Sequence, residues 1–148
     1  MKNFLKAPAL ALALSCACSM PTANAAELTI TLEGIQSNAG KIRVRLYSGK
    51  EGWLKDEGTV AIKDLSLADW SEGSLVTVMD LEAGEYAISA YQDEDDDGEL
   101  DSNFIGIPKE PAGMSNKPKA RMGPPRYEDA AFVLPEEGLA ISVKLNSN

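Results

Sequence analysis

The sequence has 148 residues, no histidine and two cysteines, Cys16 and Cys18. Without histidine, the chain cannot carry out Ser-His-Asp or Cys-His catalysis, and it lacks the usual ligand sets for zinc and copper. It also lacks a long hydrophobic run. The apolar stretch at residues 7–14 is far shorter than the ~20 residues that a transmembrane helix needs.

The N-terminal segment has the composition of a secretory signal peptide. Two lysines precede the apolar stretch, and Ala23-Asn24-Ala25 matches an A-x-A cleavage site. We therefore expect a signal peptide over residues 1–25 and a periplasmic or secreted protein with no transmembrane anchor after cleavage. Lipid attachment at Cys16 is the alternative to soluble export, although Ala13 stands where such signals usually carry leucine.

The remaining residues, 26–148, are expected to form a single acidic domain without disulfides. Two of the 14 basic residues and none of the 23 acids precede residue 26, which leaves 12 against 23 and a formal net charge of −11. This balance argues against nucleic acid and against anionic lipid surfaces as partners. Carboxylate and carbonyl oxygens are the only plentiful metal ligands, and they suit calcium or magnesium.

Apolar and polar residues alternate in several segments, as they do in half-buried strands. In one of these segments Ile42, Val44 and Leu46 face one way and two arginines face the other. The predicted strands cover residues 28–32, 42–47, 59–65, 75–81, 85–91, 131–134 and 139–145. They indicate an all-β fold, an antiparallel Greek-key sandwich of about seven strands, Ig-like or transthyretin-like.

An aspartate-rich turn follows the fifth predicted strand and has the spacing of a calcium loop. Positions 1, 3, 5, 7 and 9 of that loop are Asp93, Asp95, Asp97, Glu99 through its backbone carbonyl, and Asp101. Gly98 supplies the sharp turn at position 6. Position 12 is Phe104 instead of glutamate, and the loop leaves a strand, so an EF-hand is excluded. We predict a strand-borne calcium site, with a solvated acidic turn that binds nothing as the alternative.

The segment 104–127 is rich in proline and basic residues, and Glu110 is its one acid. A long connection without regular structure is often functional. Three interpretations stay open for it: a docking loop for an acidic or extended partner such as an envelope protein or polysaccharide, with no metal; a cover that neutralises the aspartate turn; and a crossover loop with no task. A carboxylate-dependent hydrolase ranks below these, because the acids lie in one turn instead of across a cleft.

Several stretches carry a resemblance to a known family. They are Gly84-Glu85-Tyr86-Ala87-Ile88-Ser89-Ala90-Tyr91, Leu100-Asp101-Ser102-Asn103-Phe104-Ile105-Gly106-Ile107-Pro108-Lys109-Glu110, Ser115-Asn116, Gly123-Pro124-Pro125 and Tyr127-Glu128-Asp129-Ala130-Ala131-Phe132. The chain resembles the exported bacterial family called domain of unknown function 2141 (DUF2141). The resemblance implies export and an intact domain. Family members usually carry a histidine before the aspartate turn, where this chain has Gln92, so no histidine chemistry is required and we expect no enzyme.

A looser similarity connects the chain to transthyretin-like and collagen-adhesin B-type sandwiches. It rests on the turn Leu81-Glu82-Ala83-Gly84-Glu85-Tyr86 that leads into a strand. Fold-level similarity of this kind implies an architecture and no function. Hydrolysis of the transthyretin-like type depends on histidines, which this chain lacks.

Overall fold

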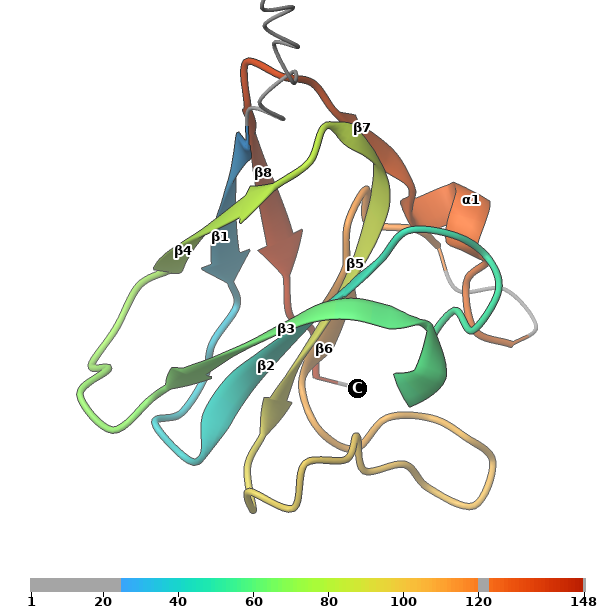
Figure 1. Ribbon diagram of the computed structural model, residues 1–148. Coiled ribbons are helices and arrows are strands. Elements are labelled where there is room, and N and C mark those ends of the chain that lie inside the picture. The colour runs from blue at the N-terminus through green and yellow to red at the C-terminus, as the bar shows by residue number, and fades with distance from the viewer. Residues whose placement is uncertain (1–24, 120–122, 148) are drawn as a thin grey trace, which may run out of the picture.

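The computed structural model describes residues 25–119 and 123–147, which form two β-sheets packed face to face (Figure 1). The strands are β1 (Ala26–Glu33), β2 (Lys41–Tyr47), β3 (Thr59–Ser66), β4 (Leu75–Leu81), β5 (Gly84–Asp93), β6 (Ala112–Met114), β7 (Phe132–Leu134) and β8 (Leu139–Lys144). Two single-turn helices, η1 (Asp56–Gly58) and α1 (Tyr127–Ala130), complete the elements. The predicted signal peptide and Cys16 lie outside the described residues, apart from Ala25.

The two sheets form the predicted all-β sandwich. One sheet has the strand order β4-β1-β8, and the other has the order β3-β2-β5-β6, with β7 paired to a different part of β5. The alternation of apolar and polar side chains explains how the two sheets pack against each other. On β1 the buried positions are Ala26, Leu28, Ile30 and Leu32, and the buried residues Ile42, Val44 and Leu46 of β2 belong to the same core. Burying each such side chain contributes about 1.5–3 kcal/mol.

Each predicted strand coincides with a strand of the structure, but two features differ from the prediction. The pair β1 and β8 is parallel, with Leu28 opposite Leu139, whereas the other paired strands are antiparallel. The segment 104–127 also contains β6, which pairs with Ser89–Tyr91 of β5. The expectation that this segment lacks regular structure is therefore wrong for residues 112–114.

β5 positions the candidate site. Its residues from Ala87 to Asp93 are buried without alternation, because the core covers one face and charged and aromatic side chains cover the other. The turn between β1 and β2 passes close to the end of this strand. Gly40 has φ +65° there, and a Cβ on it would lie 1.8 Å from the carbonyl oxygen of Asp93. Only glycine permits this approach.

A second, smaller cluster of apolar residues anchors the end of the proline-rich segment. Trp53 lies edge-on to Tyr47 and Tyr127, with ring centroids 4.8 and 5.7 Å apart. Its Nε1 donates a hydrogen bond to the carbonyl oxygen of Pro125 at 2.9 Å. Ser115 is fully buried and bonds to the backbone of β5 and of α1. These contacts give Tyr127, Trp53 and Ser115 packing roles.

Candidate metal centre

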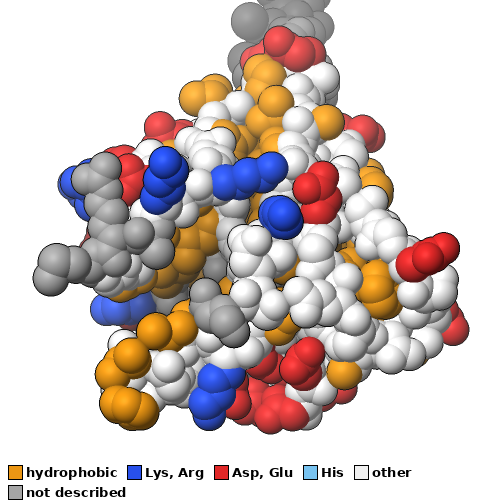
Figure 2. Space-filling view, turned by 180° about the vertical axis from the view of Figure 1, so that it is seen from behind, with side chains coloured by type: hydrophobic (Ala, Val, Ile, Leu, Met, Phe, Trp, Pro, Cys, Tyr) orange, Lys and Arg blue, Asp and Glu red, His pale blue; other side chains and the backbone are white. Residues whose placement is uncertain are grey.

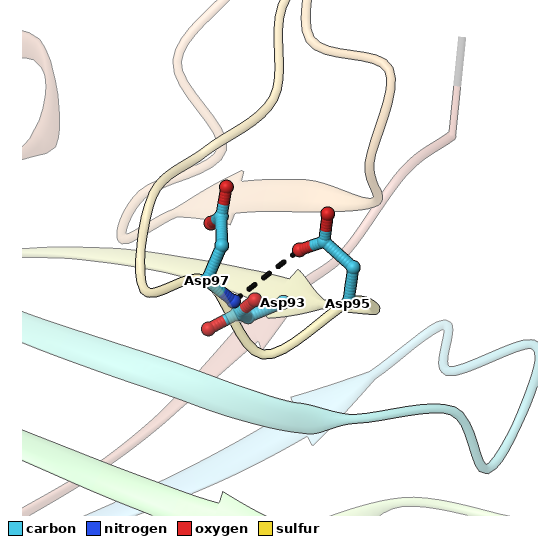
Figure 3. Close-up of side chains that lie close together, drawn as sticks. All are labelled: Asp93, Asp95 and Asp97. Carbon is cyan, nitrogen blue, oxygen red and sulfur yellow. Dashed lines mark hydrogen bonds between the residues drawn. The ribbon is translucent and has the colours of Figure 1, made fainter.

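Three of the predicted ligands come together where β5 ends. Asp93 is the last residue of β5, and Asp95 and Asp97 follow in the turn. One carboxylate oxygen from each of the three lies within 4.8 Å of the others, with Asp95 and Asp97 standing side by side above Asp93 (Figure 3). The alternate spacing in the sequence therefore brings three acidic groups close together.

Asp93 is the buried member of the group. Its side chain has no exposed surface, and its Oδ2 accepts hydrogen bonds from Lys41 Nζ at 2.9 Å and from the Gly98 backbone N–H at 3.0 Å. Burial raises the pKa of Asp93, but the hydrogen bonds from these two donors lower it by more. The net pKa therefore lies below its ordinary value. Its Oδ1 is buried and has no hydrogen-bond partner among the described residues.

An unpartnered carboxylate oxygen in the interior is costly unless a cation or a donor satisfies it. The nearby acids cannot donate a hydrogen bond when they are ionised. Oδ1 of Asp93 therefore lacks the partner that a buried oxygen requires.

The exposed carboxylates use local hydrogen bonds to hold their positions. Oδ1 of Asp95 accepts the backbone N–H of Asp97 at 3.3 Å, and Oδ1 of Asp97 accepts the N–H of Glu99 at 2.7 Å. These are Asx-type turns, which fix the carboxylates relative to the backbone. In both cases the hydrogen bond engages one oxygen of the carboxylate.

Lys41, on the neighbouring strand β2, forms ion pairs with two acids of the turn. Its Nζ lies 2.9 Å from Asp93 Oδ2 and 2.8 Å from Asp96 Oδ1. Hydrogen bonds to Asp96 and Asp93 raise the pKa of Lys41 above its ordinary value. The lysine thus neutralises part of the cluster, and Asp96 serves as its partner outside the group of three.

Basic side chains also fix the middle of the turn to the outer face of the second sheet. The carbonyl oxygen of Gly98 accepts three hydrogen bonds, from Arg43 Nη1 at 2.9 Å, Arg45 Nη2 at 3.2 Å and the Tyr91 hydroxyl at 2.8 Å. Arg43 is itself held by Asp64, which accepts hydrogen bonds from its Nε and Nη2, each at 2.8 Å. The turn is therefore anchored by its backbone, and its acidic side chains other than that of Asp93 are exposed.

Glu110 is a structural residue of the site that the sequence analysis missed. It is buried, and its two carboxylate oxygens accept the backbone N–H groups of Glu94 at 2.8 Å and Asp101 at 3.0 Å. Next to it, the carbonyl of Pro111 accepts the N–H of Gln92 at 2.9 Å. The sequence signal that could have indicated this role is that Glu110 is the one acid in a basic, proline-rich segment. Glu110 clamps both ends of the aspartate turn.

The two remaining predicted ligands lie outside the group of three carboxylates. Asp101 is exposed, and its backbone is occupied by Glu110 and by the N–H of Lys109. Glu99 is exposed, and its predicted role as a ligand through its backbone carbonyl stays a prediction. Among the described residues, no ion pair joins the basic segment 109–126 to the turn, so the neutralising contact comes from Lys41.

The fold and the site together define an all-β sandwich protein with an aspartate turn at the end of a central strand. The chain belongs to the family described as "Uncharacterized protein conserved in bacteria (DUF2141)", whose pattern matches residues 30–142. The match confirms the family resemblance and spans the whole aspartate turn. No curated protein and no solved structure matches the chain. Within residues 25–119 and 123–147, neither of the short helices has the length to cross a membrane.

Proposed function

We propose that this protein is an exported calcium-binding module of the bacterial cell envelope and that it is not an enzyme. The observation that carries the proposal is the buried carboxylate of Asp93, whose Oδ1 has no hydrogen-bond partner within the described residues and which lies close to the carboxylates of Asp95 and Asp97. A divalent cation would satisfy this oxygen. It would also offset the repulsion among acids that the turn concentrates in a few residues.

The kind of ligand favours calcium over other metals. The group offers oxygen atoms only, which excludes the ligand sets of zinc and copper. Calcium accepts six to eight oxygens in irregular geometry, whereas magnesium demands an octahedron and keeps most of its waters. A turn that supplies three carboxylates without an octahedral arrangement suits the less demanding ion, with the Glu99 carbonyl and Asp101 as further predicted ligands.

The non-enzymatic part of the proposal rests on the surroundings of the reactive groups. The hydroxyl of Ser115 is buried and bonded to backbone groups, so it is not available as a nucleophile. The clustered carboxylates lie in one turn, and Asp95 and Asp97 are exposed. General acid–base catalysis on a sugar needs two carboxylates that face each other across a substrate.

Calorimetric titration of the purified protein with calcium chloride tests the proposal, with magnesium chloride as the competing ion. We expect a dissociation constant of about 0.1–1 mM, the range of extracellular calcium modules. Calcium at ten times that constant should stabilise the fold by about 1.4 kcal/mol, which a melting curve detects. Asp93→Asn should abolish both effects, whereas Asp69→Asn, which removes an exposed acid elsewhere, should retain them. Absence of heat and of a melting shift at 10 mM calcium, about ten times the upper constant, contradicts the proposal.

A further inference from the structure

A short hairpin beyond the aspartate turn holds apolar side chains out in the solvent. We call residues 102–108 the finger. Phe104 is 99% exposed, Ile105 64% and Ile107 42%. Isolated exposed apolar residues are ordinary, but three on one short hairpin form a contiguous apolar tip, which is typical of a contact site.

The finger is braced by hydrogen bonds from within. The Asn103 carboxamide oxygen accepts the N–H groups of Ile105 and Ile107, both at 3.0 Å. The backbone of Asn103 also bonds to Ile107 and to Gly106, at 2.8 and 2.9 Å. These bonds hold the apolar tip in one shape and lower the entropy that would be lost when it enters a partner.

The finger and the candidate metal centre lie at the same end of the sandwich. Both belong to the connection from β5 to β6, which is coloured yellow to orange and forms the lower end of the molecule in Figure 1. Glu110 joins them, because its carboxylate binds Asp101 just before the finger and Glu94 in the aspartate turn. Figure 2 shows acidic and apolar side chains gathered along this lower edge, with basic groups beside them. One flat surface could touch both regions.

We propose that the finger inserts into a phospholipid bilayer and that the cation of the aspartate turn bridges to lipid phosphates. The second half of this inference rests on the proposed calcium site. Three carboxylates leave several coordination positions of calcium for other oxygens, and phosphate supplies oxygens. Lys109, exposed at the base of the finger, adds a positive charge next to it.

The negative charge of the aspartate turn explains why membrane attachment requires the cation as well as the finger. A small apolar tip gives only marginal, reversible membrane binding, so stable attachment takes a second signal. The bare aspartate turn would repel anionic lipid, and a bound divalent ion would reduce that repulsion and offer coordination positions to phosphate oxygens. Phe104 is 99% exposed, so its ring can enter the apolar part of a bilayer without a rearrangement of the finger.

Flotation with lipid vesicles tests the inference on the purified protein. The probes are vesicles of phosphatidylcholine alone and of phosphatidylcholine with one quarter phosphatidylglycerol, each with 2 mM calcium or with a chelator. We expect the protein to float with the mixed vesicles in calcium and to bind at least about tenfold less with the chelator. Phe104→Ser should reduce binding about tenfold, while Val133→Ser, which changes an apolar residue of 67% exposure far along the chain, should leave it unchanged.

Calorimetry without vesicles separates the two proposals. If Phe104→Ser binds calcium like the wild-type protein but no longer floats, the finger is the inserting element. If the wild-type protein binds calcium and does not float, or if Phe104→Ser floats equally well, the membrane proposal is overturned and the calcium site stands. If calcium does not bind in solution, the calcium site and the bridge both fail. Concentration-dependent dimers that Phe104→Ser abolishes, without flotation, would assign the finger to a second copy of the chain and overturn insertion.

Discussion

Replacing Glu110 by glutamine isolates the contribution of the clamp across the aspartate turn. The change keeps the shape of the side chain and removes its charge and one of its two acceptor oxygens. The N–H groups of Glu94 and Asp101 now share an ionised carboxylate, and a hydrogen bond to a charged group contributes about 1.5–3 kcal/mol. In the variant one N–H faces an amide NH2 group and the other keeps a weaker, neutral bond. We expect a loss of about 2–4 kcal/mol.

Thermal unfolding followed by circular dichroism measures that loss. At about 4 °C per kcal/mol for a domain of this size, the melting temperature should fall by roughly 8–16 °C. Glu137→Gln, which removes an exposed acid in the turn before β8, is the matched control and should change the melting temperature little. Amide hydrogen exchange provides a second readout, because the N–H groups of Glu94 and Asp101 should lose protection. If Glu110→Gln melts like Glu137→Gln and both amides stay protected, the clamp has been misassigned.

Three further changes examine the surroundings of the site. Lys41→Met should tighten calcium binding on the order of tenfold, because it removes a unit positive charge about 5 Å from a divalent ion; unchanged affinity in calorimetry would show that the ion binds away from Asp93. The pKa of Asp93 is lower in the folded chain than in the unfolded chain, so its stabilising effect is complete above about pH 5 and is lost as the pH falls below about 4. Urea unfolding from pH 6 to pH 3 should accordingly show a smaller acid-induced loss of stability for Asp93→Asn than for the wild-type protein, and equal losses would argue against the shift. Gly40→Ala should destabilise the fold by more than 1 kcal/mol, because the added Cβ would overlap the Asp93 carbonyl in a left-handed backbone conformation; a melting temperature equal to that of the wild-type protein would contradict this.

The architecture was accessible from the sequence because alternation reports burial directly. In β2 the order of Ile42, Arg43 and Val44 assigns one face to the core and the other to charged groups, and the structure has this arrangement. Alternation does not report the direction in which strands pair. The parallel contact between β1 and β8 therefore could not be read from it. β6 was not predicted for another reason. Ala112-Gly113-Met114 has little strand propensity, and it forms a strand because it pairs with β5.

The candidate site was predictable only where its residues are neighbours in the sequence. Asp93, Asp95 and Asp97 follow from the spacing of the turn alone. Lys41 belongs to another strand, and its contact with Asp93 depends on the antiparallel register that places the two residues opposite each other. The clamp by Glu110 depends on the return of the chain after the finger. Contacts of this kind are products of the tertiary fold and leave no local pattern.

The parallel pair of β1 and β8 also decides the order in which this domain can assemble. β1 is the central strand of its sheet, and one of its two neighbours, β8, is the last strand of the chain. Until β8 pairs with β1, one edge of β1 lacks its hydrogen-bonding partner. Contacts between distant segments form slowly, so this sheet should close late in folding. We therefore expect β1 to complete its pairing only after β8 has been synthesised and the C-terminal part of the domain is available.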